Sequence, residues 1–589
     1  MTRRESIMTR PKDSKGAFRR LLSYIGAFKA WILLVAVLCL ISNVLSLWGP
    51  SLAGSAINEA AAGVNRVDFE KVTYYAVRML AVYACSSLIT ILIHMIMVNV
   101  SKRAGRKMRQ DVFDKLMRLP VGFFDRNQAG DMISRVSYDV DVISTCMATD
   151  VVAILTSVVT VVGALIMMVR ISPMLSLVTL VTVPASIGFT AHMHKKTQPR
   201  FVKRSKAYGA MNGFVEEQLS GQKTIQAYAY EDQIDEKYND INHRAADAYY
   251  EADSLAATIG PTVGFINNIG LSLIALLGSV LYMNGSIGLG NISSFVLYSR
   301  KFSGPINEVA NIINELFSAL TAAERVFGLL DQAEELQDAE NARTLTEPEG
   351  NVALDHVFFG YEPDRTIIHD LSMQADAGKL TAIVGPTGAG KTTMINLLMR
   401  FYDVDSGSVT VDGQNVRELT RRSLRSAYAM VLQDTWVFRG TIFDNIAYGK
   451  ENATMEEVVA AAKAAHIHPF IMRLPEGYQT VISEDGGNIS KGQKQLLTIA
   501  RAMLYTSSML ILDEATSNVD TSTEREIQRA MRGLMTGRTC FVIAHRLSTI
   551  RNADNILVVN QGDVVEQGTH DELMRAKGFY YRLYRAQFE

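Results

Sequence analysis

The residues best suited to chemistry form a glycine-rich loop at positions 385–393, with the sequence G-P-T-G-A-G-K-T-T. A short apolar run precedes the loop and a helix-like run follows it, which is the strand–loop–helix setting that this pattern requires. Gly385, Gly388 and Gly390 allow the backbone to curl so that its N–H groups converge, and the helix N-terminus adds a positive dipole end. The pattern therefore predicts a site for the phosphates of a nucleoside triphosphate.

The polar side chains of this loop have distinct expected roles. Lys391 can reach the β- and γ-phosphates, and the Thr392 hydroxyl can ligate Mg²⁺. The other residues predicted to line the same site are Pro386, Thr387, Ala389 and Thr393. The cofactors that the loop predicts are ATP and Mg²⁺.

Two residues outside the loop complete the predicted binding of ATP and metal. Tyr361 precedes the loop and could stack its ring on adenine. Gln433 follows an apolar run at 428–432, where its amide could bridge Mg²⁺ and the attacking water.

Three further residues end predicted strands and are the candidates for hydrolysis. Asp513 and Glu514 follow the apolar run 509–512; Asp513 could hold Mg²⁺ through water, and Glu514 could orient or deprotonate the attacking water. His545 follows the strand-like run 540–544 and could reach the γ-phosphate, since open α/β sheets bind ligands at the carboxyl ends of their strands.

The first half of the chain has a different composition and is predicted to span a membrane. A helix needs about 20 mostly apolar residues to cross a bilayer. Six stretches qualify: residues 31–53, 74–100, 147–169, 174–193, 257–283 and 292–313. Basic side chains within them are costly at membrane depth, and either line a pathway or pair with a neighbouring helix. Examples are Arg78, His94, Arg300 and Lys301.

Basic residues set the predicted orientation of these spans. The segments after the second and fourth spans are rich in lysine and arginine, as is the amino terminus, which places all three on the cytoplasmic side. Both cytoplasmic segments are long and helix-like, at 104–119 and 208–239, so we expect helices that project into the cytosol and return. Turns are expected at residues 123–127 and 227–231.

Length and composition bound the remaining possibilities. At 589 residues the chain predicts at least two domains, and a net charge of −1 argues against a nucleic-acid partner. Residues 331–349 are acidic and amide-rich and are predicted to link a transmembrane domain, 1–330, to a nucleotide-binding domain, 350–589. The four cysteines show no metal-type spacing, and no disulfides are expected.

One more motif brings these features together. Ile489-Ser490-Lys491-Gly492-Gln493 precedes a helix-like run and resembles the signature sequence of ATP-binding-cassette (ABC) ATPases. With it, nearly the whole chain resembles a half-transporter of the ABC exporter type. The resemblance implies an all-α, six-helix transmembrane domain with long cytosolic extensions, fused to an α/β P-loop ATPase domain. It also implies residence in the cell inner membrane, with the ATPase domain in the cytoplasm.

The resemblance further implies a dimer in which two ATPase domains enclose two ATP molecules. Ser490, Gly492 and Gln493 would contact the ATP held by the other chain. Lys491 stands where the family has glycine, and the chain otherwise carries a complete catalytic set. That combination resembles heterodimeric multidrug exporters, whose partner chain has an unaltered signature but a replaced glutamate or histidine. A homodimer that tolerates lysine is the alternative.

The predicted function is therefore ATP-driven export of amphipathic or hydrophobic compounds by alternating access. The expected partners are a second half-transporter, membrane lipids and a hydrophobic small molecule. The alternatives are a homodimeric lipid or peptide exporter, and a nucleotide-gated channel or regulator with the same fold. Six spans argue against a soluble cassette ATPase that acts on DNA or ribosomes, and no residue pattern selects the substrate.

Overall fold

A computed structural model describes residues 13–26, 28–61, 67–362, 364–433, 435–483, 486–513, 521–544 and 546–588. The chain divides into two compact units. The first comprises Met1–Leu119 and Asn127–Glu334, and the second comprises Pro120–Arg126 and Glu335–Glu589. The second unit therefore takes in a short segment that the sequence assigned to the transmembrane domain, and it begins 15 residues before the predicted start of the nucleotide-binding domain at 350.

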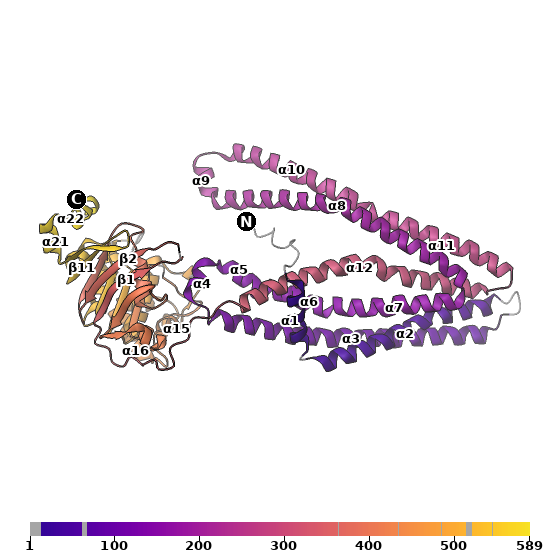
Figure 1. The fold of residues 1–589 in the computed structure, drawn as a ribbon, viewed down its shortest axis with the longest axis horizontal. Coiled ribbons are helices and arrows are strands. Elements are labelled where there is room, and N and C mark those ends of the chain that lie inside the picture. Colours follow the sequence, from indigo (N-terminus) through magenta and orange to yellow (C-terminus); the bar gives the residue numbers. More distant parts are fainter. Residues whose placement is uncertain are drawn as a thin grey trace. The chain divides into compact units, whose positions relative to one another are not determined.

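The first unit is built from helices only, within the part of the chain that the structure describes (Figure 1). These are α1 (Ser14–Gly26), α2 (Lys29–Ala60), α3 (Phe69–Leu116), α5 (Ala129–Ser134), a π-helical turn (Arg135–Asp139), α6 (Val140–Ala148), α7 (Asp150–Ile171), α8 (Pro173–Ser220), α9 (Gln222–Ala227), α10 (Glu231–Ala257), α11 (Ile259–Met283) and α12 (Leu289–Leu330). α2 packs along α3, while α12 packs against α2 and α7.

Five segments are long and apolar enough to cross a membrane by length and composition, among the described residues. They are Lys29–Ala60, Phe69–Leu116, Ala129–Ile171, Pro173–Ser220 and Glu231–Met283. The sixth predicted span, residues 292–313, lies within α12, a continuous helix of 42 residues. α12 is not among the five because polar and charged residues such as Arg300 and Lys301 lower its hydropathy, so its role as a span stays a prediction.

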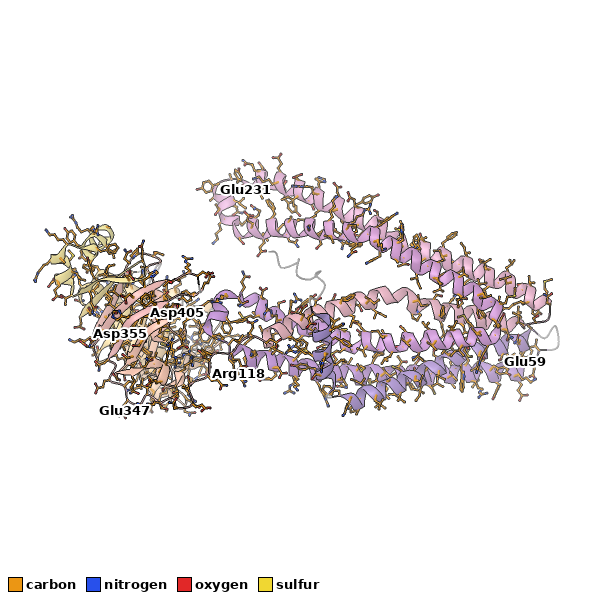
Figure 2. The ribbon with its side chains drawn as sticks, in the orientation of Figure 1. Glu59, Arg118, Glu231, Glu347, Asp355 and Asp405 are labelled. Atoms are coloured by element: carbon orange, nitrogen blue, oxygen red, sulfur yellow. The ribbon has the colours of Figure 1, made fainter. Side chains whose placement is uncertain are left out.

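The helices extend well beyond a bilayer. α3 and α8 each have 48 residues, or about 72 Å at 1.5 Å per residue, against about 30 Å of hydrocarbon. Figure 2 shows Glu59 at one end of the helical unit and Arg118 and Glu231 at the other. The predicted turn at 227–231 joins α9 to α10, with Ala229 at a φ of +49°. The other predicted turn, at 123–127, is instead a short helix, α4 (Val121–Arg126).

The described part of the second unit contains three sheets. Its strands are β1 (Val352–Phe359), β2 (Ile368–Ala375), β3 (Leu380–Val384), β4 (Ser406–Val411), β5 (Gln414–Asn415), β6 (Tyr428–Val431), β7 (Gly440–Thr441), β8 (Val481–Ile482), β9 (Met509–Asp513), β10 (Thr539–Ile543), β11 (Asn555–Asn560) and β12 (Asp563–Gly568). The central sheet has the order β12-β11-β3-β10-β9-β6, in which only the β11–β12 pair is antiparallel. The others form β2-β1-β4-β5 and β7-β8.

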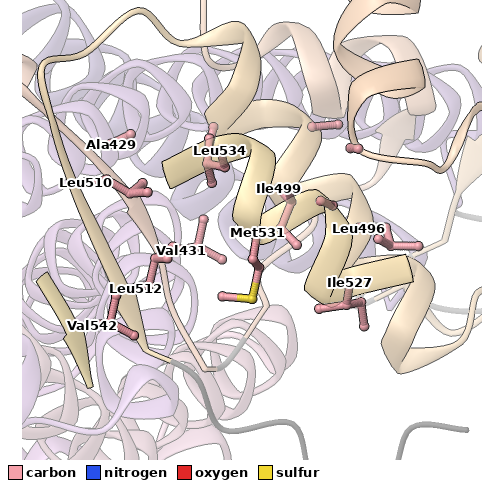
Figure 3. Packing of buried hydrophobic residues seen from close by; sticks show 14 of the residues in the cluster. Ala429, Val431, Leu496, Ile499, Leu510, Leu512, Ile527, Met531, Leu534 and Val542 are labelled. Carbon is pink, nitrogen blue, oxygen red and sulfur yellow. The ribbon is translucent and has the colours of Figure 1, made fainter. Parts of the chain in front are cut away.

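Helices cover the central sheet on both faces. They are α13 (Lys391–Leu398), α14 (Arg421–Ser426), α15 (Ile442–Ala447), α16 (Met455–Ala464), α17 (His468–Ile471), α18 (Lys491–Leu504), α19 (Thr521–Met535), α20 (Leu547–Arg551), α21 (His570–Ala576) and α22 (Phe579–Phe588). Alternate residues along a strand point to opposite faces. Leu510 and Leu512 therefore pack with Leu496 of α18 and Met531 of α19 on one face (Figure 3). Ile511 packs on the other face, in the cluster that contains α13.

Part of the predicted linker, residues 331–349, packs against the second unit. Arg343 pairs with Leu419 in an isolated β-bridge, and Leu345 is buried. The nearly buried guanidinium of Arg421 donates to the Leu336 carbonyl at 2.7 Å and to Asp338 at 2.9 Å. Residues 335–345 are thus part of the ATPase unit, because its arginines need the acidic side chains of this segment.

Candidate nucleotide site

The phosphate loop joins the carboxyl end of β3 to the first residue of α13. Gly388 and Gly390 adopt φ angles of +80° and +104°, a region that disfavours other residues, so successive N–H groups can turn to one side. A Cβ on Gly385 would lie 2.1 Å from the Val559 carbonyl oxygen. Glycine is therefore required there for close approach to β11, and the loop has the geometry of an anion cradle.

Lys391 lies over this loop. Its ammonium donates to the carbonyls of Gly385 at 2.7 Å and Pro386 at 3.0 Å. Burial lowers the pKa of Lys391, and the nearby carboxylate of Asp513 acts in the opposite direction. Lys391 and Asp513, which lie far apart in the sequence, are thus close enough to interact electrostatically. The Thr392 hydroxyl is on the exposed side of α13, and Thr393 is buried.

The register of the central sheet brings the other predicted residues to the same edge. Ile543 of β10 pairs with both Ile383 and Asp513, and Val431 of β6 pairs with Leu512. The phosphate loop, Asp513 and the exposed Gln433 therefore all follow the carboxyl ends of parallel strands. Glu514 and His545 lie outside the described residues, directly after Asp513 and Ala544 in the chain.

Tyr361 connects the predicted base site to the helix of the phosphate loop. Its hydroxyl donates to Thr393 Oγ1 at 3.3 Å and accepts from Asn396 Nδ2 at 3.0 Å. Its ring meets those of Phe359 and Tyr402 edge-on, with centroids 5.0 and 4.9 Å away. Tyr361 and Tyr402 line one side of a cavity of about 480 Å³. This cavity is large enough for a purine base.

Two residues of α4 belong to this cavity and were not identified from the sequence. The Arg126 guanidinium donates to the Tyr361 carbonyl at 2.7 Å, and the Tyr402 hydroxyl donates to Asp125 at 2.5 Å. Burial and the Asp125 carboxylate raise the pKa of Tyr402, which keeps its hydroxyl protonated as a donor. The short α4 is therefore bonded to the residue that is predicted to stack on adenine.

Replacing Tyr361 by Ala is expected to raise the KM for ATP several-fold while kcat changes little. Stacking is made equally in the ground and transition states, so its loss weakens binding alone. Tyr361→Phe keeps the ring and loses only the bonds to Thr393 and Asn396, and should stay near the parent KM. Steady-state ATPase kinetics on both variants decide the matter; a fall in kcat alone would contradict a stacking role.

The signature residues begin α18 on the opposite face of the sheet from α13. Ser490 Oγ accepts from the Gln493 N–H at 3.2 Å, and Gln493 Oε1 accepts from the Ser490 N–H at 2.9 Å. This reciprocal pair is a capping box, which fixes the start of the helix. Gly492 is buried and Lys491 is exposed at the first position of the helix. The phosphate loop and the signature residues, which are the two predicted sets of ATP contacts, thus lie on opposite faces of the central sheet.

Comparison with known proteins agrees with both units. Residues 32–306 match the ABC transporter transmembrane region family, and residues 368–517 match the ABC transporter family of ATPase domains. The Uncharacterized ABC transporter ATP-binding protein YfiC of Bacillus subtilis is 41% identical over 98% of this chain and 95% of its own length. The Fatty acid ABC transporter ATP-binding/permease protein of Mycobacterium bovis is 45% identical, over 88% of this chain and 82% of its own.

A solved structure extends the likeness to three dimensions. A bacterial Atm1-family ABC exporter with ATP bound superposes with a TM-score of 0.74 at 29% identity, covering 98% of this chain and 99% of the other. The chain belongs to the ABC transporter family, as an exporter with fused transmembrane and ATP-binding domains. It is a membrane ATPase that couples ATP hydrolysis to transport, and such exporters work as dimers.

Proposed function

We propose that this chain exports amphipathic or hydrophobic compounds across the inner membrane, with Mg²⁺-ATP hydrolysed at its own phosphate loop. The observation that carries the proposal is the register of β3, β9, β10 and β6, which gathers the loop, Asp513 and Gln433 at one edge of the sheet. The fatty acid transporter among its relatives acts on an amphipathic compound by name, which supports this substrate class.

The residues present fit Mg²⁺ bound together with ATP. The described residues contain no group of three or more His, Cys, Asp or Glu side chains that could hold a metal alone. Mg²⁺ typically uses one or two protein ligands and completes its shell with phosphates and water. The Thr392 hydroxyl, the Asp513 carboxylate and the Gln433 amide would supply the protein part, and the ion would neutralise charge on the phosphates.

The chain's own groups have separable tasks in this scheme. Lys391 holds the phosphates, Tyr361 holds the base, Glu514 takes a proton from the attacking water, and His545 contacts the γ-phosphate. ATP binding closes the two ATPase domains, the long helices carry that closure to the spans, and hydrolysis resets them. A channel or regulator would need no general base, so Glu514 and His545 favour turnover.

We further propose that the working unit is a heterodimer and that this chain supplies its competent catalytic residues. Lys491 is exposed at the N-terminus of α18, where the family has glycine. Glycine lets the backbone approach a γ-phosphate closely, whereas lysine adds a Cβ and a long cation. The altered signature would serve the partner's phosphate loop. The site built on this chain's Lys391 and Glu514 would use the partner's signature.

Expression of the chain alone tests the heterodimer. We expect an unstable or inactive product that recovers on co-expression with a half-transporter encoded beside it. Size-exclusion chromatography and ATPase assays in nanodiscs report both properties. A monodisperse homodimer with substrate-stimulated ATPase and ATP-dependent uptake into vesicles would overturn the heterodimer and leave the export function standing.

A further inference from the structure

The basic side chains predicted at membrane depth do not share one role. Lys301 of α12 donates to the Ser46 carbonyl at 3.2 Å and to Ser46 Oγ at 2.6 Å. Ser46 lies four residues before Pro50 in α2, and proline has no N–H to bond that carbonyl. Arg78 of α3 donates to Tyr74 on its own helix at 2.8 Å and lies over its ring. Both cations therefore have structural partners.

Arg300 differs from its neighbour Lys301. It is exposed, and among the side chains that the structure describes it has no hydrogen-bonding or ionic partner. It lines a cavity of about 330 Å³ between α8, α11 and α12, within the first unit. An ionisable residue at membrane depth without a structural partner is a candidate for function.

The cavity lies near the middle of the expected bilayer. At 1.5 Å per residue, Arg300 is about 17 Å from the start of α12 at Leu289, and Thr182 is about 14 Å from the start of α8 at Pro173. Leu271 is about 18 Å from the end of α11 at Met283. All three helix ends belong to the short outward links, so the three estimates agree on a depth near half of a 30 Å hydrocarbon core.

The lining is polar for this depth. Besides Arg300 it includes Asn267, Asn268, Ser299 and Ser303, and no carboxylate is among the described residues that line it. Ser186 Oγ donates to Asn267 Oδ1 at 3.4 Å, which leaves the NH₂ group of Asn267 to donate. A Cβ added to Gly264 would meet nothing within 4 Å, so the space beside this residue is open. The site thus offers one fixed positive charge and amide donors.

The charge of the lining indicates a negatively charged ligand. A guanidinium binds a carboxylate or phosphate through two parallel hydrogen bonds, and such bonds are strong where water is scarce. A cationic compound would meet Arg300 with no carboxylate among the described lining residues to offset it, and a neutral one would leave the guanidinium unpaired. We infer that this cavity binds the anionic head group, carboxylate or phosphate, of a single-chain amphiphile. The inference rests on the proposed export function and narrows its substrate class.

The test compares head groups on one hydrocarbon chain. The full-length chain, with any partner that it needs, is placed in nanodiscs and titrated with hexadecanoic acid, hexadecyl phosphate, hexadecanol and hexadecylamine. We expect half-maximal ATPase stimulation at concentrations about tenfold lower for the two anions, the scale of one charge-assisted contact. A diazirine-bearing fatty acid should label peptides of α8, α11 and α12, which reports binding without turnover.

Matched variants assign the preference to Arg300. Arg300→Gln should remove both the preference and the labelling, and Arg300→Lys should retain much of each. Arg78→Gln deletes a membrane-depth cation that already has a partner, and should change neither. If Arg300→Gln fails to fold, Gly264→Leu fills the cavity and should abolish labelling, whereas Gly264→Ala should not. The ratio between the carboxylate and phosphate curves identifies which anion is preferred.

Several outcomes would overturn the inference. Equal potency of the alcohol or amine would show that charge is not recognised, and a preference that survives Arg300→Gln would place the anion elsewhere. Labelling confined to other helices would exclude this cavity. The proposed function fails separately, if no amphiphile stimulates ATPase activity and ATP drives no accumulation in vesicles.

Discussion

Replacing Glu514 by Gln is expected to lower steady-state ATP hydrolysis by about 100-fold or more, the scale of general-base catalysis. Glu514 directly follows Asp513, which ends β9 beside the phosphate loop. Glutamine keeps the shape of the side chain and removes the group that we propose accepts a proton from water. ATP binding should persist, because Lys391 and the loop are unchanged.

The measurement needs a binding assay beside the rate. Fluorescent-nucleotide binding to the purified Glu514→Gln complex should match the parent while phosphate release falls. Glu526→Gln is a suitable control, since Glu526 is exposed on α19 and loses the same charge. Near-normal hydrolysis by the Glu514 variant would reject the assignment, and loss of nucleotide binding would show a structural role instead.

Gly290→Ala is expected to destabilise the helical unit by about 3 kcal/mol, the upper end of the range for an overpacked core. A Cβ on Gly290 of α12 would lie 1.8 Å from the Gly54 carbonyl oxygen of α2. The position of this Cβ is fixed by the α12 backbone and the oxygen belongs to the α2 backbone, so the clash is relieved only by separating the two helices. The same contact holds the Gly290 N–H, which donates to Asn58 Oδ1 at 2.7 Å.

Thermal unfolding of the detergent-solubilised protein measures this effect. The Gly264→Ala variant is the matched control, because its added methyl meets nothing within 4 Å and alanine favours a helix over glycine. We expect a lower Tm and less monodisperse protein for Gly290→Ala only. Equal Tm values would mean that α2 and α12 do not approach this closely in the membrane.

The fold of the ATPase unit was predictable, and the residues proposed for its site follow local patterns. A glycine-rich loop after an apolar strand, and acidic or amide residues at strand ends, need only the rule that parallel strands share an edge. The roles of Arg126 and Tyr402 were not predicted, because the contact of Arg126 with Tyr361 and that of Tyr402 with Asp125 each join segments that lie far apart in the sequence. The six-residue α4 is also too short to show a helical period, so the sequence predicts only a turn there.

The membrane cations show where sequence reasoning stops. Arg300 and Lys301 are adjacent, so both are cations at nearly the same depth in the same local sequence. Arg300 nevertheless lines a cavity, whereas Lys301 donates to Ser46 of α2. Neighbouring residues of a helix point about 100° apart, and only the packing of α2, α8 and α11 around α12 decides which face is which. That this segment is a helix was predictable from the sequence, whereas the different surroundings of Arg300 and Lys301 were not.

The docking of residues 335–345 defines where the ATPase unit can be cut from the chain. A fragment that began at residue 350 would lack Leu336 and Asp338, leaving Arg421 with Asp403 as its remaining carboxylate partner. Removing one partner from a buried ion pair costs about 3–5 kcal/mol where the other charge is left uncompensated, and the retained Asp403 keeps the cost here below that figure. A fragment that starts at Glu335 keeps these contacts and the Glu335–Arg425 pair. The accessible cleavage point between the halves of this transporter is therefore the short segment that follows α12, at residues 331–334.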